Sequence, residues 1–259
     1  MITFHDWIYS VYPAGGAVQG AWSAFHIITL IVCIGICVAI AFLIRPRSEK
    51  CRKTAIRIIS GLILFFELAR RIINFTRGDT MDFQLFMSRL IPRPWCAISC
   101  WLLIFAPLVN KKFFYNFTAM SALLTSVIFF AYPVVGFNNK YILFENVYSI
   151  ATHCLQLIGA LALITLKFTD FKYHNGGVKD SAIKELICLA AVYLYSVIEI
   201  LIFGAQEDPL YYVPNGEVQT VLGMSYPVYL VCYILFIVVW FNAFYVITYL
   251  INKKKQGSK

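Results

Sequence analysis

Seven apolar stretches constrain the fold of this chain more than any other feature. A helix needs about 20 apolar residues to cross the hydrocarbon core of a bilayer, because it rises about 1.5 Å per residue. Backbone groups in lipid must be paired within a helix or a closed barrel, and runs of this length exclude barrel strands. The sequence therefore predicts an all-α, polytopic membrane bundle of about seven helices. The predicted helices are 22–44, 54–75, 95–109, 113–132, 142–168, 182–203 and 226–251.

The composition agrees with a single integral membrane domain over residues 1–259. Hydrophobic residues make up 60% of the chain and charged residues only 14%, whereas soluble domains carry about a quarter charged residues. A soluble fold of this length could not bury so much apolar surface. The longest segments between the apolar stretches, 77–94 and 204–225, contain several prolines. We expect them to form ordered caps or re-entrant turns at one end of the bundle.

The positive charges predict the orientation. Of the 22 Lys and Arg residues, 16 fall on one side of the predicted bundle, in short clusters between apolar stretches. Because an excess of Lys and Arg marks cytoplasmic loops, this side is expected in the cytoplasm together with the C-terminus, and the N-terminus outside. The net charge of +9 therefore reflects membrane orientation and does not indicate nucleic-acid binding.

The cysteine pattern gives no sign of a metal or a cofactor. None of the eight cysteines forms a CxxC pair or a Cys/His zinc spacing, and no paired set lies in an external loop, so we expect neither a zinc site nor a disulfide framework. The chain also has no convincing internal repeat, which weakens the case for a transporter built from inverted repeats.

Ionisable residues within the apolar stretches are candidate functional residues, because burying charge in lipid is costly. Glu67, Arg70 and Arg71 lie in the outer half of the second stretch, Glu199 in the outer third of the sixth, and His26 near the outer end of the first. Their similar depths predict a polar pocket that opens towards the outer leaflet. Glu67 can pair with an arginine three or four residues later. That pair is either a packing device, or it leaves one arginine to bind a phosphate or carboxylate.

Cys96 and His153 form the sharper candidate pair. A thiol is a poor nucleophile unless a neighbouring base or cation favours the thiolate. His153, near the middle of the fifth stretch, could accept that proton and return it to a leaving group. The alternative is that the histidine bonds a neighbouring helix and the cysteine only packs.

The order of several short motifs resembles the YwaF-like bacterial integral membrane proteins. Residues 89–99, Arg-Leu-Ile-Pro-Arg-Pro-Trp-Cys-Ala-Ile-Ser, resemble the Leu-Pro-Leu-His-Leu-Cys motif of that family. Trp22-Ser-Ala-Phe-His26 and Ser149-Ile-Ala-Thr-His153 are similar to two further family elements. The turn Tyr211-Tyr-Val-Pro214 precedes Tyr226-Pro-Val-Tyr229, which is similar to the family's Trp-Pro-x-Tyr element before the last helix. The resemblance covers nearly the whole chain.

The YwaF-like group is similar to eukaryotic transmembrane protein 164, whose members are lysophospholipid acyltransferases, and more distantly to the androgen-induced hydrolases of fatty-acid esters. The resemblance implies a Cys96 nucleophile and a His153 base acting on an acyl ester of a membrane phospholipid or lysophospholipid. The acyl group would form a thioester, released by a lipid hydroxyl, an amine or water. The resemblance also implies a multi-pass protein of a cell membrane, with a bacterial plasma membrane favoured.

Two departures from the family pattern keep other functions open. Pro94 replaces the histidine two residues before the cysteine, and Gln206-Glu-Asp208 replaces the usual Asn-Tyr. Arg93, next to Pro94, joins the candidate substrate-binding residues, which are Arg70, Arg71, Glu67, Glu199, His26 and Arg93. The first alternative is a non-catalytic scaffold, a lipid-binding protein or a subunit of a membrane complex with a protein partner. The second is a transporter.

Overall fold

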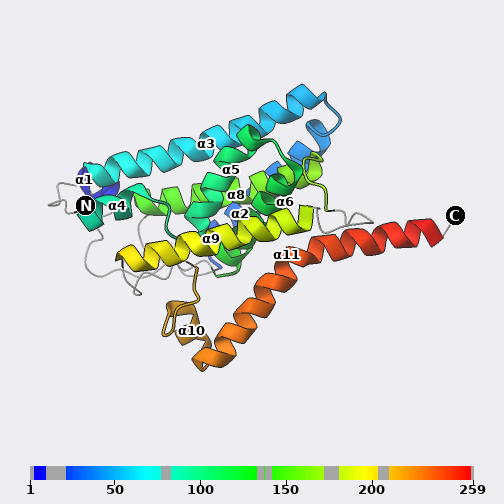
Figure 1. Cartoon of the computed structure of the whole chain (residues 1–259). Coiled ribbons are helices and arrows are strands. Elements are labelled where there is room, and N and C mark those ends of the chain that lie inside the picture. The colour runs from blue at the N-terminus through cyan, green and yellow to red at the C-terminus, as the bar shows by residue number, and fades with distance from the viewer. Residues whose placement is uncertain are drawn as a thin grey trace.

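The computed structural model describes residues 3–9, 22–76, 83–132, 137, 142–171, 181–203 and 210–257, and these residues form helices joined by turns, without a strand. This result confirms the predicted all-α class. The helices run mostly along one common direction (Figure 1). They are α1 (Phe4–Ile8), α2 (Ala24–Leu43), α3 (Glu49–Phe75), α4 (Phe83–Leu90), α5 (Trp95–Val109), α6 (Lys112–Ala131), α8 (Phe144–Thr165), α9 (Ser181–Phe203), α10 (Glu217–Leu222) and α11 (Tyr226–Gly257).

Among the described residues, five helices are long and apolar enough to cross a membrane: α2, α6, α8, α9 and α11. Helix α5 is equally apolar but has only 15 residues, and α3 is long enough but carries charges in both halves. Each of the seven predicted stretches thus contains a helix. Helix α3 begins at Glu49 rather than at residue 54, and α11 continues to Gly257 rather than ending at residue 251, because basic segments extend both helices.

The predicted outer segments are partly helical. Within the described part of 77–94, the short helix α4 precedes α5, and within that of 204–225, α10 precedes α11. Helices α1 and α4 lie at one end of the bundle, and the turn between α2 and α3 lies at the other (Figure 1). We call the second end the basic end, because Arg45, Arg47 and the α5–α6 turn with Lys111 lie there. The opposite end is the far end.

Helices α6 and α8 form the centre of the bundle. In their apolar spans 78% and 61% of the residues are buried, compared with 17% in α2 and 17% in α11. Helices α3 and α5 pack against this centre, while the first half of α11 slants away from the other helices (Figure 1). Polar side chains that α3, α5, α6 and α8 direct inward are therefore shielded from lipid.

Close contacts hold α5 between α3 and α8. Gly159 of α8 has no side chain, and a Cβ atom placed there would come within 3.0 Å of Leu103 on α5. On the other side, the hydroxyl of Ser60 in α3 donates to the carbonyl of Leu103 at 2.8 Å. These contacts fix the depth of α5, which begins directly after Pro92-Arg93-Pro94.

Candidate functional site

Cys96 is the second residue of α5, and its depth is set by a bond to α8. Its backbone carbonyl accepts a hydrogen bond from Nε2 of Gln156 at 2.7 Å. Gln156 lies roughly 18 Å along α8 from Phe144, at about 1.5 Å per residue. Cys96 therefore begins its helix well inside the bundle, and not at the end where α8 begins. Its side chain is half-buried.

The start of α5 leaves donors available beside the cysteine. The N-cap residue is Pro94, which makes no side-chain hydrogen bond to the helix. The first N–H groups of a helix have no partner within it, so the first-turn amides of α5 are not capped by a side chain. A helix N-terminus carries partial positive charge, which stabilises a negative charge that develops close to it.

Gln156 links three helices at this depth. Besides the Cys96 carbonyl, its Nε2 approaches Sγ of Cys100 at 2.9 Å, and its Oε1 accepts from the Thr125 hydroxyl at 2.7 Å. The side chain is fully buried. Sequence reasoning missed Gln156 because it considered only ionisable side chains. An amide in the middle of an apolar helix is a comparable signal, since it too must find partners in lipid.

His153 lies one turn before Gln156 on the same side of α8. Its Nδ1 is 2.7 Å from the carbonyl oxygen of Ser149, and its ring stacks on Phe129 at 3.9 Å between centroids. A carbonyl can only accept, so Nδ1 carries the hydrogen, and Nε2 is the acceptor in the neutral ring. The residue retains 9% exposure. The bond to Ser149 therefore fixes the tautomer of the neutral ring and leaves the lone pair on Nε2.

Glu67 is fully buried and held by two partners. It forms an ion pair with Arg71, four residues later, and accepts a hydrogen bond from the Tyr148 hydroxyl at 2.5 Å. Of the two arginines that the sequence offered, the structure thus pairs Glu67 with Arg71. Arg71 also donates from Nε to the carbonyl of Leu90 at 3.1 Å and lies 5.1 Å above the ring of Trp101. These contacts engage most of the Arg71 guanidinium.

Arg70 has its partners on α8, whereas Arg71 pairs within its own helix. Arg70 forms an ion pair with Glu145 at 2.9 Å, near the start of α8, and lies 4.7 Å from the ring centre of Tyr148. Its side chain is 33% exposed, and its buried Nε has no hydrogen-bond partner among the described residues. Arg70 and Glu67 both lie close enough to act electrostatically on the Cys96 thiol. Arg70 is therefore better placed than Arg71 to receive an anionic group.

Glu199 and Arg93 lie where α9 meets the link before α5. The Tyr195 hydroxyl donates to the Pro92 carbonyl at 2.9 Å, which joins α9 to this link. Glu199, Arg93 and Arg71 all act electrostatically on Tyr195, and Glu199 is 2% exposed. The structure thus gathers Glu199 and Arg93 around Tyr195, on the α9 side of the Cys96 region.

His26 occupies an aromatic environment. It is fully buried, with the rings of Phe137, Trp22 and Phe130 at 4.6, 5.2 and 6.0 Å between centroids. None of its described contacts is with the charged residues of α3. Through Phe130 and its neighbour Phe129 it adjoins the ring of His153. The described residues contain no group of three or more His, Cys, Asp and Glu side chains arranged to hold a metal ion.

Comparison with known proteins decides the family. Residues 21–248 match the TMEM164 family. The chain belongs to the TMEM164 family. The matched range extends from the start of α2 into α11 and includes Cys96, His153 and the ion pairs of α3. The predicted resemblance to transmembrane protein 164 is therefore confirmed, and with the apolar helices it identifies a multi-pass membrane protein. No protein with a curated description and no solved structure matches the chain.

Proposed function

We propose that this TMEM164-family protein is a membrane-embedded acyltransferase or acyl-ester hydrolase of lipids, with Cys96 as nucleophile and His153 as base. The hydrogen bond from Gln156 to the Cys96 carbonyl is the observation that carries the proposal. It joins the start of α5 to the side of α8 that also bears His153, one helical turn away. The bond of His153 to Ser149 leaves Nε2 to take the thiol proton.

The start of α5 stabilises negative charge at Cys96, against the opposing effects of burial and of the Glu67 carboxylate. The positive end of the helix favours a thiolate at Cys96. The uncapped first-turn amides can donate to the oxyanion that forms when a nucleophile attacks an acyl carbonyl. Arg70 adds a nearby positive charge. Cysteine is therefore better placed here than in the middle of a helix, where the amides are already paired.

The reaction divides into two steps. The Cys96 thiol gives its proton to Nε2 of His153, and the sulfur attacks the ester carbonyl carbon of the lipid. The ester C–O bond then breaks, the histidine protonates the departing lipid alkoxide so that it leaves as a hydroxyl, and a thioester remains on Cys96. In the second step His153 takes a proton from an acceptor hydroxyl, an amine or water. That acceptor attacks the thioester and the thiol is restored.

The surroundings suit a phospholipid or lysophospholipid. Arg70, one-third exposed and with a buried Nε that has no partner among the described residues, can hold a phosphate through its planar donor fork. Glu67 and Arg71 are positioning residues: they pair with each other and hold Tyr148 of α8 and the Leu90 carbonyl of α4 in place. Helix α2 presents a largely exposed apolar surface, along which an acyl chain can lie in the bilayer. In this proposal the site opens to the outer leaflet, following the orientation that the basic residues predict.

Pro94, which departs from the family pattern, is compatible with this placement. Its extended backbone begins α5, so Cys96 keeps its position in the first turn. The base in the proposed reaction is His153, which does not depend on residue 94. A specific observation supports the non-catalytic alternative: Glu67 and Arg71 satisfy each other inside the bundle, as a purely structural pair would. In that case the protein binds lipid or a membrane partner without turnover.

Intact mass spectrometry separates the two functions. The purified protein, incubated in bilayers with a defined phospholipid, should gain the mass of one acyl group that hydroxylamine removes, as expected for a thioester. The adduct should be absent in Cys96→Ala and retained in Cys232→Ala, a matched change at an exposed cysteine of α11. An adduct on Cys232, or full lipid turnover by Cys96→Ala, would refute the acyl-enzyme mechanism.

A further inference from the structure

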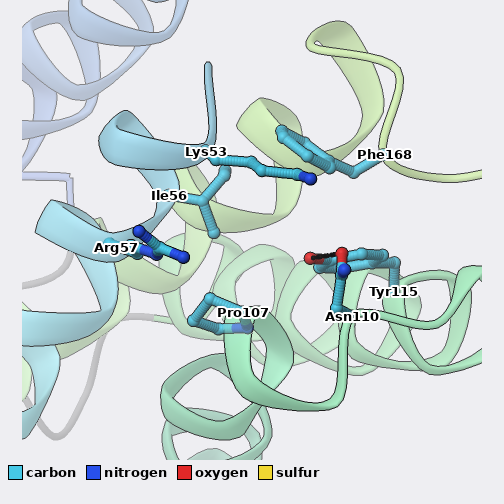
Figure 2. Close-up of a pocket in the computed structure, with 7 residues that line it drawn as sticks. All are labelled: Lys53, Ile56, Arg57, Pro107, Asn110, Tyr115 and Phe168. Carbon is cyan, nitrogen blue, oxygen red and sulfur yellow. Dashed lines mark hydrogen bonds between the residues drawn. The ribbon is translucent and has the colours of Figure 1, made fainter. Parts of the chain in front are cut away.

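A cavity of about 270 Å³ lies at the basic end, between the start of α3, the α5–α6 turn and the end of α8. This volume is close to the roughly 300 Å³ at which small-molecule sites begin. A smaller cavity of about 50 Å³ adjoins it and shares four of its lining residues (Figure 2). Charged residues of the larger cavity are Arg52, Lys53, Lys112, Lys167 and Glu49, and the smaller one adds Arg57.

Positive charge is in clear excess around these cavities. Five basic side chains face a single carboxylate, Glu49, which forms an ion pair with Lys53 at 2.7 Å. Like charges gathered in one place repel one another, and an anion bound between them relieves that repulsion. The cavity residues Glu49–Arg57 lie near the start of α3, whereas Glu67, Arg70 and Arg71 of the Cys96 region lie near its end.

The helix ends account for the presence of only some of the five basic side chains. Helices α5 and α8 end at the cavity, and their last carbonyls attract cations. Arg52 donates to the carbonyl of Leu166 at 3.1 Å, and Lys112 to that of Lys167 at 3.0 Å. These two bonds account for Arg52 and Lys112 as capping residues. They do not account for Lys53 or Arg57, and the buried Nε of Arg52 still has no partner among the described residues.

Lys167 lines the cavity from a backbone conformation that lysine rarely adopts. It has a positive φ of 65°, directly after the end of α8, and Phe168 donates back to the Leu163 carbonyl at 2.9 Å. This is the position of the Schellman motif at which glycine is strongly preferred. A lysine here strains the backbone, because a left-handed conformation brings its Cβ close to the following carbonyl oxygen. The strained position places a basic side chain at the cavity that glycine could not provide.

A neutral donor completes the lining. The hydroxyl of Tyr115 donates to Oδ1 of Asn110 at 3.1 Å, as Figure 2 shows. That bond fixes the side-chain amide of Asn110 and leaves Nδ2 as the group with hydrogens to donate. Ammonium, guanidinium and amide donors together match the oxygens of a phosphate group.

We propose that this cavity binds a phosphate group, carried by the headgroup of an anionic lipid or by free phosphate. Basic pockets between membrane helices at the cytoplasmic side are suited to anionic headgroups, and the charge bias predicts that the basic end faces the cytoplasm. The cavity lies at the end of the apolar spans, where headgroups lie. The site binds an anion without transforming it.

The test compares two double variants that remove equal charge from the same end of the protein. Lys53→Gln with Arg57→Gln alters the cavity lining, whereas Arg47→Gln with Lys50→Gln removes two exposed charges outside it. Native mass spectrometry with phosphatidylglycerol measures retained lipid, and thermal stabilisation by inorganic phosphate in detergent measures the free ion. The lipid arm and the ion arm distinguish the two sources of phosphate.

We expect the cavity variant to bind the effective probe about 30-fold more weakly, because it lacks two basic residues that each contribute about 1 kcal/mol near a membrane surface. The control variant should stay within about twofold of the wild type, because exposed charges are screened. Equal losses in both variants would show diffuse surface attraction and overturn the proposal. Binding of neither probe by the wild-type protein would overturn it as well.

Discussion

The region around Cys96 and the cavity at the basic end handle charge in opposite ways. Around Cys96, two acidic residues pair with arginines of α3: Glu67 with Arg71 and Glu145 with Arg70. At the basic end, Glu49 is the one carboxylate in a lining with five basic side chains. Internal pairing fixes the position of helices and leaves little net charge, whereas unbalanced charge requires a partner from outside. The first region is thus suited to orient a reaction, and the second to hold an anion.

We expect the largest effect on lipid acyl turnover from removing the attacking sulfur atom of Cys96. Cys96→Ala should reduce lipid acyl turnover to background while the helicity and the oligomer size remain, because few atoms are removed. His153→Gln keeps a donor and an acceptor but is no useful base, so turnover should fall by about 100-fold or more. Turnover by radiolabelled acyl transfer in bilayers is the measurement. If only one of the two variants loses activity, the residues do not act as a pair.

We expect a smaller effect, on thermal stability, from breaking the buried ion pair between Glu67 and Arg71. Glu67→Ala leaves Arg71 inside the bundle without its partner, and removing one member of a buried ion pair costs about 3–5 kcal/mol. The melting temperature in detergent should therefore fall sharply. The matched variant Glu49→Ala breaks an exposed pair of the same i, i+4 spacing and should leave the melting temperature unchanged. Equal effects of the two variants would show that the Glu67 pair is not structurally special.

Lys167→Gly should shift stability and anion binding in opposite directions. Glycine adopts a positive φ without strain, so the free energy of unfolding should rise by about 1 kcal/mol. Phosphate or phosphatidylglycerol binding should weaken by several-fold, because one cavity cation is lost. Thermal melts with and without the probe separate the two effects. A variant that is more stable and binds equally well would remove Lys167 from the site.

The smallest expected effect comes from Glu49. The hydrogen bond from Lys53 lowers the pKa of the Glu49 carboxyl below its ordinary value of 4.5. The carboxylate is therefore charged at neutral pH, and what the pair contributes to stability is lost only as the pH falls through that lowered pKa. Glu49→Gln should free Lys53 and strengthen anion binding by a few-fold at pH 7. Weaker anion binding in Glu49→Gln would contradict the charge argument.

Hydropathy and charge spacing in the sequence were sufficient to predict much of the fold. The apolar stretches contain the helices because length and apolarity are local properties that lipid enforces. The pairing of Glu67 with an arginine on the same helix was also accessible, since four-residue spacing fixes it. By contrast, the choice of Arg71 over Arg70 depends on α8, where Tyr148 and Glu145 lie far away in the sequence.

Other features could not be predicted from the sequence, because they depend on how distant segments pack together. Gln156 contacts Cys96 only because Gly159 lets α5 approach α8 closely. The cavity at the basic end arises where three helix ends meet, and no local pattern in Lys53 or Lys167 indicates it. The positive φ of Lys167 could not be predicted either, because the sequence has a lysine where this backbone conformation favours glycine.

The charges of α3 also bear on how the protein is made. A charged residue at the centre of a helix costs about 2.5–3.5 kcal/mol on insertion, and Glu67, Arg70 and Arg71 all lie within this one helix. Their partners on α8, Tyr148 and Glu145, are synthesised about 4–15 s later at 5–20 residues per second. During that interval α3 must be retained beside α2 or by the insertion machinery.

We therefore expect nascent chains that end before α8 to leave α3 only partly inserted, and Glu67→Leu to improve its insertion. A glycosylation tag placed after α3 would report both. The ion pairs that order the finished protein thus impose a delay on its biogenesis.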